Sequence, residues 1–392
     1  MRTQVAIVGA GPAGLMLAHL LSLEGIRSIV IESRTRDYVE HRLRAGVLEQ
    51  GSADLLDATG AGARMRSEGL VHHGIQLRFG GLDHRIDFGS LTGGRGITVY
   101  GQQEIVKDLI AIRLSAGHPI LFEVSEVRLH DIETEQPSIS FVRDGAGATI
   151  ECDVIAGCDG FHGVSRDSIP AGVLTTYERE YPFAWLGILA DIAPSSEELI
   201  YCYHERGFAL LSMRSPTVSR LYLQVPADEP IGDWPDARIW EELRTRLAAD
   251  GWSLAEGPIT EKGITAMRSL VVEPMQFGRL FLSGDAAHIV PPTGAKGMNL
   301  AFRDVSVLAH AVVAYFTKRD TRLLDEYSAS CLRRVWRAQH FSWWMTSMLH
   351  RSPDSDAYQT RLQLAQLAYT VNSRAASMSL AENYVGYEWA TT

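Results

Sequence analysis

Short apolar runs and amphipathic segments alternate along the first part of the chain. Residues 4–8 (QVAIV) form a β-branched run that ends at Gly9, which is typical of a buried strand in a parallel sheet. Residues 13–23 are apolar on most faces and predict a helix, with Gly25 in position for the C-cap. Residues 28–32 form a second apolar run. Strand, helix and strand in this order predict a βαβ unit.

Beyond residue 60 the hydrophobic pattern changes twice. Residues 120–150 and 181–225 alternate apolar and polar positions between Gly and Pro breaks, which favours antiparallel strands. The second segment is rich in aromatic residues and predicts a sheet with one face against a ligand or another layer. The pattern therefore predicts an α/β fold, α+β overall, with a mostly helical C-terminal region. Helical patterns cover residues 102–114, 236–250, 298–316, 323–349 and 356–369.

The junction between the first strand and the first helix carries a glycine motif. Gly9, Gly11 and Gly14 match G-x-G-x-x-G, and Pro12 falls in the first helical turn. These glycines permit a tight turn, the approach of a pyrophosphate and close packing of helix on strand. Glu32 ends the second strand 18 residues after Gly14 (32 − 14), where an acidic group would bind ribose hydroxyls. The combination predicts a Rossmann-like dinucleotide site.

A second nucleotide-contacting segment is predicted far along the chain. The apolar run 279–283 is typical of a buried strand, and Gly284 and Asp285 follow it before a loop with two prolines and several glycines. A lone Asp at a strand end is often an ordinary turn residue. Its pairing with the glycine motif 275 residues earlier (284 − 9) favours one extended ligand held by both segments. A further strand ends at the Asp-Gly turn of Asp159.

Composition limits the classes of function. Hydrophobic residues make up 46% and charged residues 21% of the 392 positions, as in an ordinary globular protein. A formal net charge of −10 argues against bulk nucleic-acid binding, which needs a basic surface. The four cysteines form no C-x-x-C pair and no zinc-like cluster with histidine. We therefore expect structural thiols in a reducing compartment and no metal site.

The N-terminal apolar run could be mistaken for a secretory signal. It contains three glycines at fixed spacing and a proline, continues into a second β-like run and lacks a convincing cleavage site. No window reaches the ~18 uninterrupted apolar residues of a membrane span. We therefore expect a cytoplasmic protein without a membrane partner.

Five basic residues follow the second strand closely: Arg34, Arg36, His41, Arg42 and Arg44. A solvated basic face is one interpretation of this cluster. In an acidic chain, directly after an adenosine-binding strand, a phosphate-facing cluster is favoured. No second G-x-G-x-x-G follows a strand elsewhere, so a nicotinamide coenzyme would bind without a Rossmann domain of its own.

The order of these motifs resembles that of the class A flavoprotein aromatic monooxygenases. Matching stretches span essentially the whole chain and include residues 42–51, 156–162, 286–297 and 341–347. The resemblance implies FAD as the cofactor, with its pyrophosphate on the glycine motif and its ribityl chain at Asp285. It further implies NADPH and O2 as co-substrates. Oxygen would be inserted beside a phenol hydroxyl through a flavin C4a-hydroperoxide.

The reaction implied by the resemblance is the hydroxylation of 4-hydroxybenzoate to 3,4-dihydroxybenzoate. We expect residues 1–175 to form a Rossmann-like FAD-binding domain, 176–285 a substrate-binding β-sheet domain, and 286–392 the flavin loop with a helical C-terminal and interface region. A homodimer is the typical assembly of the family. The open alternatives are a related substrate such as 3,4-dihydroxybenzoate, a preference for NADH, and, more remotely, a non-catalytic flavin redox sensor.

The resemblance assigns a carboxylate anchor to one strand pattern. Ser212 and Arg214 are two positions apart, so their hydroxyl and guanidinium face the same side of a strand and could hold one carboxylate. Tyr222, on a nearby strand pattern, would be a third donor. Without the resemblance, Ser-x-Arg would be interpreted as a solvent-facing pair.

The resemblance also assigns a proton relay and a ring contact. Tyr201 and Tyr384 match the pair that relays the phenol proton, with His72 at the outer end. A phenol and a tyrosine both have a pKa of about 10, and a histidine near about 6.5 can exchange the proton with solvent. Each tyrosine could otherwise be a core residue, and His72 a surface one. Pro292 would place its carbonyl near the substrate hydroxyl, and Thr293 would lie against the ring.

The remaining implied contacts are with FAD and NADPH. Besides the glycines and Glu32, the FAD contacts are Arg42, Arg44, Gln102, Asp159, Asp285 and Asn299. The NADPH contacts are Arg34, Tyr38, Arg42, His162, Arg166 and Arg268. The chain departs from the family at Ser33, where NADPH-preferring members carry Arg, and at Arg303, which has no catalytic interpretation.

Overall fold

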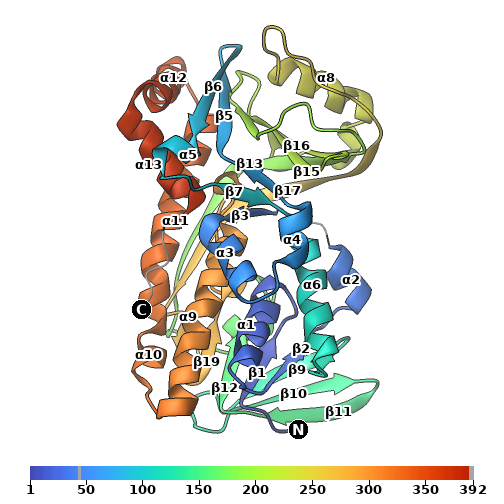
Figure 1. Ribbon diagram of the computed structural model, residues 1–392, viewed down its shortest axis with the longest axis vertical. Helices are drawn as coiled ribbons and strands as arrows, with labels where there is room; N and C mark the ends of the chain where they lie inside the picture. Colours follow the sequence, from blue (N-terminus) through green and yellow to red (C-terminus); the bar gives the residue numbers. More distant parts are fainter. Residues whose placement is uncertain (43–45, 388–392) are drawn as a thin grey trace.

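The computed structural model describes residues 1–42 and 46–387 (Figure 1). Its lower part contains a six-stranded sheet with five parallel strands and one antiparallel edge strand. In spatial order the strands are β18 (Gln276–Phe277), β19 (Leu280–Leu282), β12 (Val154–Gly157), β1 (Val5–Val8), β2 (Ser28–Ile31) and β8 (Ile120–Leu121). The carboxyl ends of β1, β2 and β12 therefore meet at one edge, where a ligand site is expected in such sheets.

Helices pack against this sheet. α1 (Pro12–Leu23) follows β1 and contacts α6 (Gln102–Ser115) and α9 (Gly297–Lys318). Pro12 begins α1, as predicted, because its missing N–H needs no partner in the first turn. Buried apolar side chains from these strands and helices form one continuous core. The predicted Rossmann-like βαβ unit is confirmed.

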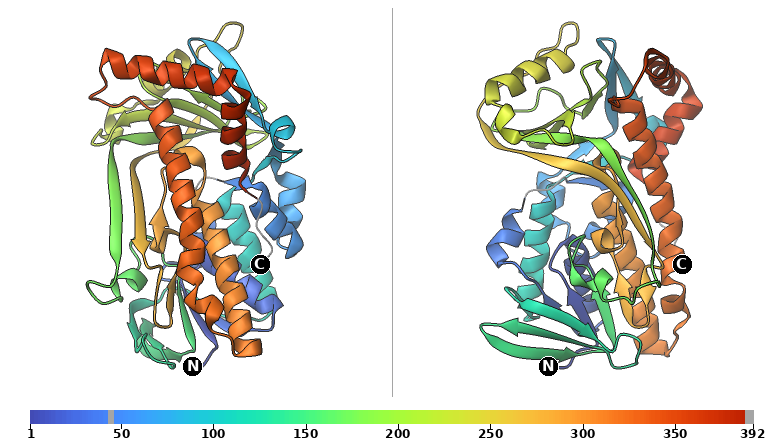
Figure 2. Two further views of the ribbon diagram at one scale, coloured as in Figure 1. Left: turned by 90° about the vertical axis from the view of Figure 1, so that its left-hand side faces the viewer. Right: turned by 180° about the vertical axis from the view of Figure 1, so that it is seen from behind.

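A second sheet of eight strands lies beyond the first along the long axis (Figures 1 and 2). Its strands pair antiparallel except for a parallel β14–β5 pair. In spatial order they are β20 (His288–Ile289), β17 (Ile259–Glu273), β13 (Thr175–Ala190), β16 (Val218–Pro226), β15 (Ala209–Ser215), β14 (Ile200–Cys202), β5 (Gly74–Phe79) and β6 (Leu82–Asp87). The long strands β13 and β17 extend from this sheet toward the first (Figure 2). α8 (Asp236–Arg246) packs on it through a second apolar core.

Smaller elements join the two sheets or extend them. One three-stranded sheet consists of β3 (Val47–Glu49), β7 (Ile97–Val99) and β4 (Leu70–His72). Another consists of β9 (Ser125–His130), β10 (Ser138–Arg143) and β11 (Ala146–Glu151). The short helices are α2 (Arg36–His41), α3 (Gln50–Ala58), α4 (Ala63–Glu68), α5 (Phe88–Leu91) and α7 (Val164–Asp167).

The C-terminal region is helical, as predicted. The pattern at 323–349 resolves into α10 (Arg322–Asp325) and the long α11 (Tyr327–Leu349), followed by α12 (Ala357–Asn372) and α13 (Arg374–Val385). By length and composition alone, α9 is apolar enough to cross a membrane, and over half of its most apolar window is buried inside the structure.

β5 and β6 join the second sheet although residues 74–87 precede most of its other strands in the sequence. The division into three domains stays a prediction.

Candidate active site

The glycine motif forms a backbone cradle at the end of β1. A Cβ on Gly9 would lie 2.4 Å from the carbonyl oxygen of Cys158, and one on Gly14 would lie 2.0 Å from the carbonyl oxygen of Gly9. Both positions therefore exclude a side chain. A Cβ on Gly11 would meet nothing within 4 Å, so this glycine borders open space at the N-terminus of α1. Such a cradle fits a pyrophosphate, which the helix N-terminus and its N–H groups attract.

Two carboxylates lie at the same edge of the sheet. Glu32 follows β2 and accepts the N–H groups of Ala10 and Arg34, each at 2.8 Å, so it fixes the loop beside the cradle. Asp159 follows β12 and accepts the backbone N–H and the hydroxyl of Ser165 through Oδ2, each at 2.9 Å. Asp159 Oδ1 is buried without a partner among the described residues. An unsatisfied buried acceptor at this edge fits a hydroxyl or amide donor from a bound dinucleotide.

The flavin loop consists of two 3₁₀ turns, residues 284–286 and 292–294. Asp285 is exposed at the first turn although its neighbours on both sides are buried. Pro292 is exposed at the second turn, and its carbonyl accepts the N–H of Ala295 at 2.9 Å. The buried Thr293 hydroxyl shares a hydrogen bond of 2.8 Å with Thr346 on α11. The loop thus exposes one carboxylate and one proline, while Thr293 is buried and bonded to α11.

Asn299 joins the flavin loop to β3. Its amide donates to the carbonyl oxygens of Val47 (3.0 Å) and Ala295 (2.8 Å), and its side-chain oxygen accepts the N–H of Glu49 at 2.9 Å. The side chain is therefore engaged within the protein, and its predicted contact with FAD stays a prediction. Arg44, also predicted to contact FAD, lies outside the described residues.

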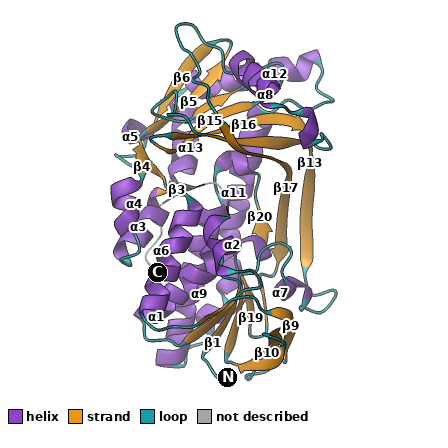
Figure 3. Cartoon of the chain, turned by 90° about the vertical axis from the view of Figure 1, so that its right-hand side faces the viewer, coloured by secondary structure: helices purple, strands orange, loops and turns teal. Residues whose placement is uncertain are grey.

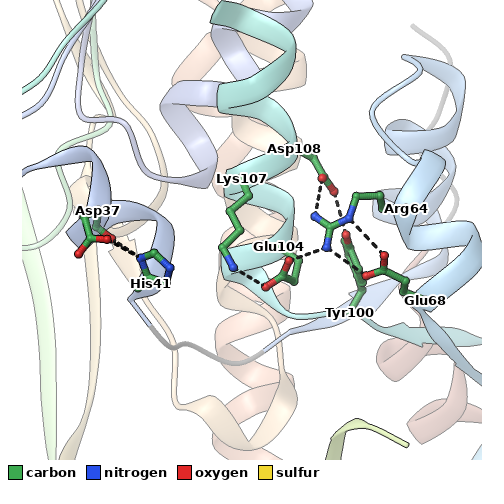
Figure 4. Close-up of polar contacts among 8 residues, drawn as sticks. All are labelled: Asp37, His41, Arg64, Glu68, Tyr100, Glu104, Lys107 and Asp108. Atoms are coloured by element: carbon green, nitrogen blue, oxygen red, sulfur yellow. Dashed lines mark hydrogen bonds and ion pairs between the residues drawn. The ribbon is translucent and has the colours of Figure 1, made fainter.

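Ion pairs join α4 to α6 beside the predicted FAD contact Gln102 (Figure 4). Arg64 contacts Glu104 at 2.7 Å and Asp108 at 2.8 Å. The Tyr100 hydroxyl donates to the other oxygen of Asp108 at 2.8 Å. These contacts fix the segment that leads into Gln102. Sequence reasoning missed them because charged residues on helices are usually solvated.

The predicted carboxylate anchor lies on β15 and β16. Ser212 pairs with Arg220 across these strands, and Arg220 Nε donates to the Tyr222 hydroxyl at 3.1 Å. Ser212 is buried, and its hydroxyl has a long contact of 3.5 Å with a neighbouring carbonyl. Burial and, more weakly, the adjacent Arg220 lower the pKa of Arg214 to about 10. Arg214 therefore stays cationic at neutral pH, and two guanidinium groups lie close together at this end of the site.

The two tyrosines of the predicted relay contact each other. The hydroxyls of Tyr201 and Tyr384 are 2.5 Å apart, although 183 positions separate the residues. Both side chains are almost fully buried, in an apolar cluster that includes Trp185, Leu199 and Leu210. Burial raises the pKa of both tyrosines, so neither ionises alone at neutral pH.

The outer end of the predicted relay is less directly connected. His72 is buried on β4, and burial lowers its pKa to about 4. Its Nδ1 has no hydrogen-bond partner among the described residues, and none of their hydrogen bonds links it to Tyr384. His72 does line a surface cleft of about 640 Å³ between β4 and residues 193–197. Its role in the relay stays a prediction.

A buried ion-pair cluster next to Tyr384 was missed by sequence reasoning. Lys296 donates to Glu49 at 2.7 Å and to the carbonyl oxygen of Tyr384 at 2.9 Å. Arg334 forms a second ion pair with Glu49. Burial by itself raises the pKa of Glu49, but the two cations outweigh it and hold the pKa below its ordinary value. Lys296 and Glu49 both lie in stretches that carry the family resemblance, which is the signal that could have found them.

A second missed residue is His350, behind the pocket wall. Its Nε2 accepts the indole N–H of Trp185 at 2.6 Å, and its Nδ1 contacts the carbonyl oxygen of Thr346 at 3.1 Å. Its ring stacks on Phe208 at 4.4 Å and on Phe183 at 4.9 Å. Burial lowers the pKa of His350 to about 3, so the imidazole is neutral. It therefore acts as a fixed acceptor for Trp185.

The predicted NADPH residues form two cation–aromatic clusters. Arg34 and Arg42 lie 5.3 and 5.8 Å from the ring of Tyr38. Arg166 and Arg268 lie 4.9 and 4.7 Å from the ring of Phe161, which His162 contacts edge-on at 4.8 Å. Figure 3 draws both α2, which carries Tyr38, and α7, which carries Arg166. Coenzyme binding by these clusters stays a prediction.

The geometry agrees with comparisons to known proteins. Residues 2–342 match the family described as FAD binding domain. The chain therefore belongs to the FAD binding domain family, in the class of flavoprotein monooxygenases, and FAD is its cofactor. The cradle, Glu32 and Asp159 are the residues that could hold its dinucleotide part.

Within that class the chain resembles p-hydroxybenzoate hydroxylase. It is 49% identical over 387 residues to the p-hydroxybenzoate hydroxylase of Acinetobacter baylyi, covering 98% of this chain and 96% of that protein. The crystal structure of p-nitrophenol 4-monooxygenase from Pseudomonas putida aligns with a TM-score of 0.84 over 99% of this chain and 100% of that one. Its identity is 19%, so this likeness shows the fold alone. The family and fold predicted from the sequence are confirmed.

Proposed function

We propose that this protein hydroxylates 4-hydroxybenzoate beside its phenol group to give 3,4-dihydroxybenzoate, with FAD, NADPH and O2. The observation that carries the proposal is the buried pair of Tyr201 and Tyr384 hydroxyls, 2.5 Å apart, with Tyr201 on the same sheet as the cationic residues Arg214 and Arg220. A benzoate with a para hydroxyl matches a site with cations at one end and a proton-accepting chain at the other. The named activity of the Acinetobacter baylyi relative supports the same substrate.

The residues would act first by binding and orienting the substrate. Arg214 can hold the carboxylate through two parallel N–H bonds, while Ser212 and Tyr222 offer hydroxyl donors. This binding places the phenol group toward Tyr201. The apolar wall around Trp185 excludes water from the ring, which strengthens these polar contacts.

The tyrosine pair would then take up the phenol proton. The Tyr201 oxygen would accept it while its own proton passes to the Tyr384 oxygen, and the proton of Tyr384 would leave toward solvent through His72, so neither tyrosine gains net charge. Because burial raises the pKa of both tyrosines, the substrate phenol, rather than either tyrosine, becomes the group that is easiest to ionise. FAD, when bound, supplies the oxygen transfer. Ionisation of the phenol makes the adjacent ring carbon more electron-rich and prepares it for that step.

For the coenzyme we propose NADPH at the two cation–aromatic clusters. Arg34 and Arg42 flank Tyr38 directly after the predicted adenosine strand, although position 33 is Ser.

We further propose a cytoplasmic homodimer. The exposed Trp336 and Trp343 on α11 are compatible with a contact between two copies.

The first experiment measures coenzyme oxidation by the purified protein in air, with and without 4-hydroxybenzoate, and identifies the product. Substrate-stimulated oxidation with 3,4-dihydroxybenzoate as product supports the proposal. Bound flavin without stimulated turnover on either 4-hydroxybenzoate or 3,4-dihydroxybenzoate would favour a redox sensor instead. Repeating the assay with NADH decides the coenzyme.

A second experiment tests the relay. Tyr201→Phe removes the hydroxyl that bonds to Tyr384, so the variant should bind the substrate but oxidise NADPH without hydroxylating it. Tyr203→Phe is the matched control, because this tyrosine is also buried but its hydroxyl has no partner among the described residues. Equal coupling of oxidation to hydroxylation in Tyr201→Phe and the control would contradict the relay.

A further inference from the structure

One buried carboxylate holds both ends of the turn that presents Asp285. Asp304, on α9, accepts the backbone N–H of Gly284 at 3.0 Å and the Nε2–H of His288 at 2.6 Å. Both contacts use the same oxygen, Oδ2. Asp304 and His288 are each only 1% exposed. A single atom therefore sets the distance between the start and the end of the turn.

The backbone of the turn is fixed by further contacts as well. Gly284 has a φ of +62°, which favours glycine, and its carbonyl accepts the N–H of Ala287 at 2.9 Å. His288 belongs to β20 and pairs with Val271 of β17. Asp285 alone is exposed within residues 280–288. The turn therefore has a rigid base and one carboxylate aimed away from the core.

The charges around His288 come from several elements. Burial by itself lowers its pKa, but Asp304 and, more weakly, Asp285 outweigh this effect and raise it. From α11, Tyr327 and Cys331 lie near Asp304. The Tyr327 hydroxyl bonds to the carbonyl oxygen of Leu282 and to Ser283, one step before the turn, at 2.8 Å each. Thus Tyr327 supports the strand that enters the turn, whereas Asp304 holds the turn itself.

We propose that Asp304 and His288 are positioning residues for FAD: they hold Asp285 at the place where it contacts the cofactor. A buried ion pair adds little net stability, because desolvation offsets most of its attraction. The ion pair matters more for the shape of the loop than for its stability. Its two hydrogen bonds fix a five-residue turn around the one side chain that points outward. The inference rests on the proposed contact between Asp285 and FAD.

The test measures FAD affinity with full-length variants from which FAD has been removed. Flavin fluorescence quenching on titration with FAD gives the dissociation constant, and thermal unfolding of the same samples gives Tm. Asp304→Ala removes both bonds and should weaken FAD binding about tenfold or more, since a buried donor loses its partner. Asp304→Asn can keep an amide oxygen in the place of Oδ2, where it accepts from both Gly284 N–H and His288 Nε2–H, so it should restore affinity to within about threefold of the parent. Tyr327→Phe, the matched control, should lower Tm without changing FAD affinity.

Two results would overturn the proposal. One is an Asp304→Ala variant that binds FAD like Tyr327→Phe at a similar loss of Tm, because Asp304 would then be only structural. The other is an Asp304→Asn variant as impaired as Asp304→Ala, because the two hydrogen bonds would then not set the turn. The assumption about Asp285 is tested separately. If Asp285→Ala binds FAD as the parent does, the proposed FAD contact fails, whereas the bonds of Asp304 can still be judged from its own variants.

Discussion

His350 should make the protein sensitive to acid in a way that a single substitution removes. Its imidazole is buried and neutral, with Nε2 accepting from Trp185 and Nδ1 contacting Thr346. Above pH 6.5 both the folded and the unfolded chain hold this histidine neutral, and its contribution to stability is complete. As pH falls below 6.5, His350 binds a proton in the unfolded chain but not in the folded chain. The free energy of unfolding therefore decreases until the pH reaches the pKa of His350 in the folded chain.

The size of this effect follows from the two pKa values. Burial lowers the pKa of His350 from 6.5 to about 3. Linkage then gives a loss of about 2 kcal/mol in the free energy of unfolding between pH 7 and pH 5. His350→Gln removes the titration while keeping the geometry, because Oε1 can accept the indole N–H and Nε2 can donate to Thr346. The stacking on Phe208 is lost, which costs about 1 kcal/mol at both pH values.

The assay is urea unfolding of the FAD-loaded protein at pH 7 and pH 5, followed by tryptophan fluorescence. The parent should lose about 2 kcal/mol more than His350→Gln between the two pH values. His310→Gln, at an exposed position of α9, is the control for loss of an imidazole. His72, with a lowered pKa of about 4, contributes in the same direction in parent and variant and cancels from the comparison. Equal losses in parent and His350→Gln would refute the neutral-imidazole assignment.

Three further substitutions test other parts of the site. Arg214→Lys should weaken 4-hydroxybenzoate binding by about 1.5–3 kcal/mol, because an ammonium cannot reproduce the two-pronged contact; an unchanged dissociation constant would remove Arg214 from the anchor. Glu49→Gln leaves Lys296 and Arg334 without their counter-charge and should lower the free energy of unfolding in urea by about 3–5 kcal/mol. A variant as stable as the parent would show that solvent compensates the two cations. Arg268→Ala should raise the KM for NADPH several-fold without changing substrate affinity, and steady-state kinetics with an unchanged KM would place the coenzyme elsewhere.

The sequence predicted the elements whose signals are local. β1, α1 and β2 follow from a β-branched run, a glycine motif and a second apolar run, all within 32 residues. The placement of β5 and β6 could not be read in this way. β5 pairs with β14, over 120 positions later, and such long-range pairing leaves no trace in a local hydrophobic pattern.

The residues of the candidate site show the same difference between local signals and long-range contacts. Tyr201, Tyr384 and Arg214 were predicted only because family positions assigned them, since their residue types are common in cores and on strands. Glu49 and His350 escaped prediction because their chemistry depends on burial next to a specific partner. Glu49 and Lys296 are separated by 247 positions, and only the folded chain makes them an ion pair. Burial, rather than residue type, turns such groups into parts of a site.

The anchoring of the flavin loop would let one segment contact both of the ligands proposed for it. Asp304 on α9 holds its first turn, Thr346 on α11 holds its second turn through Thr293, and Glu49 on β3 holds its end through Lys296. The three anchors come from three different elements, so the loop cannot shift at one turn without straining the bonds at the others. The spacing between the carboxylate proposed to face FAD and the proline proposed to face the substrate is therefore set by the packing of α9 against α11. Substitutions at that helix contact should alter the coupling of coenzyme oxidation to hydroxylation before they alter the affinity for either ligand.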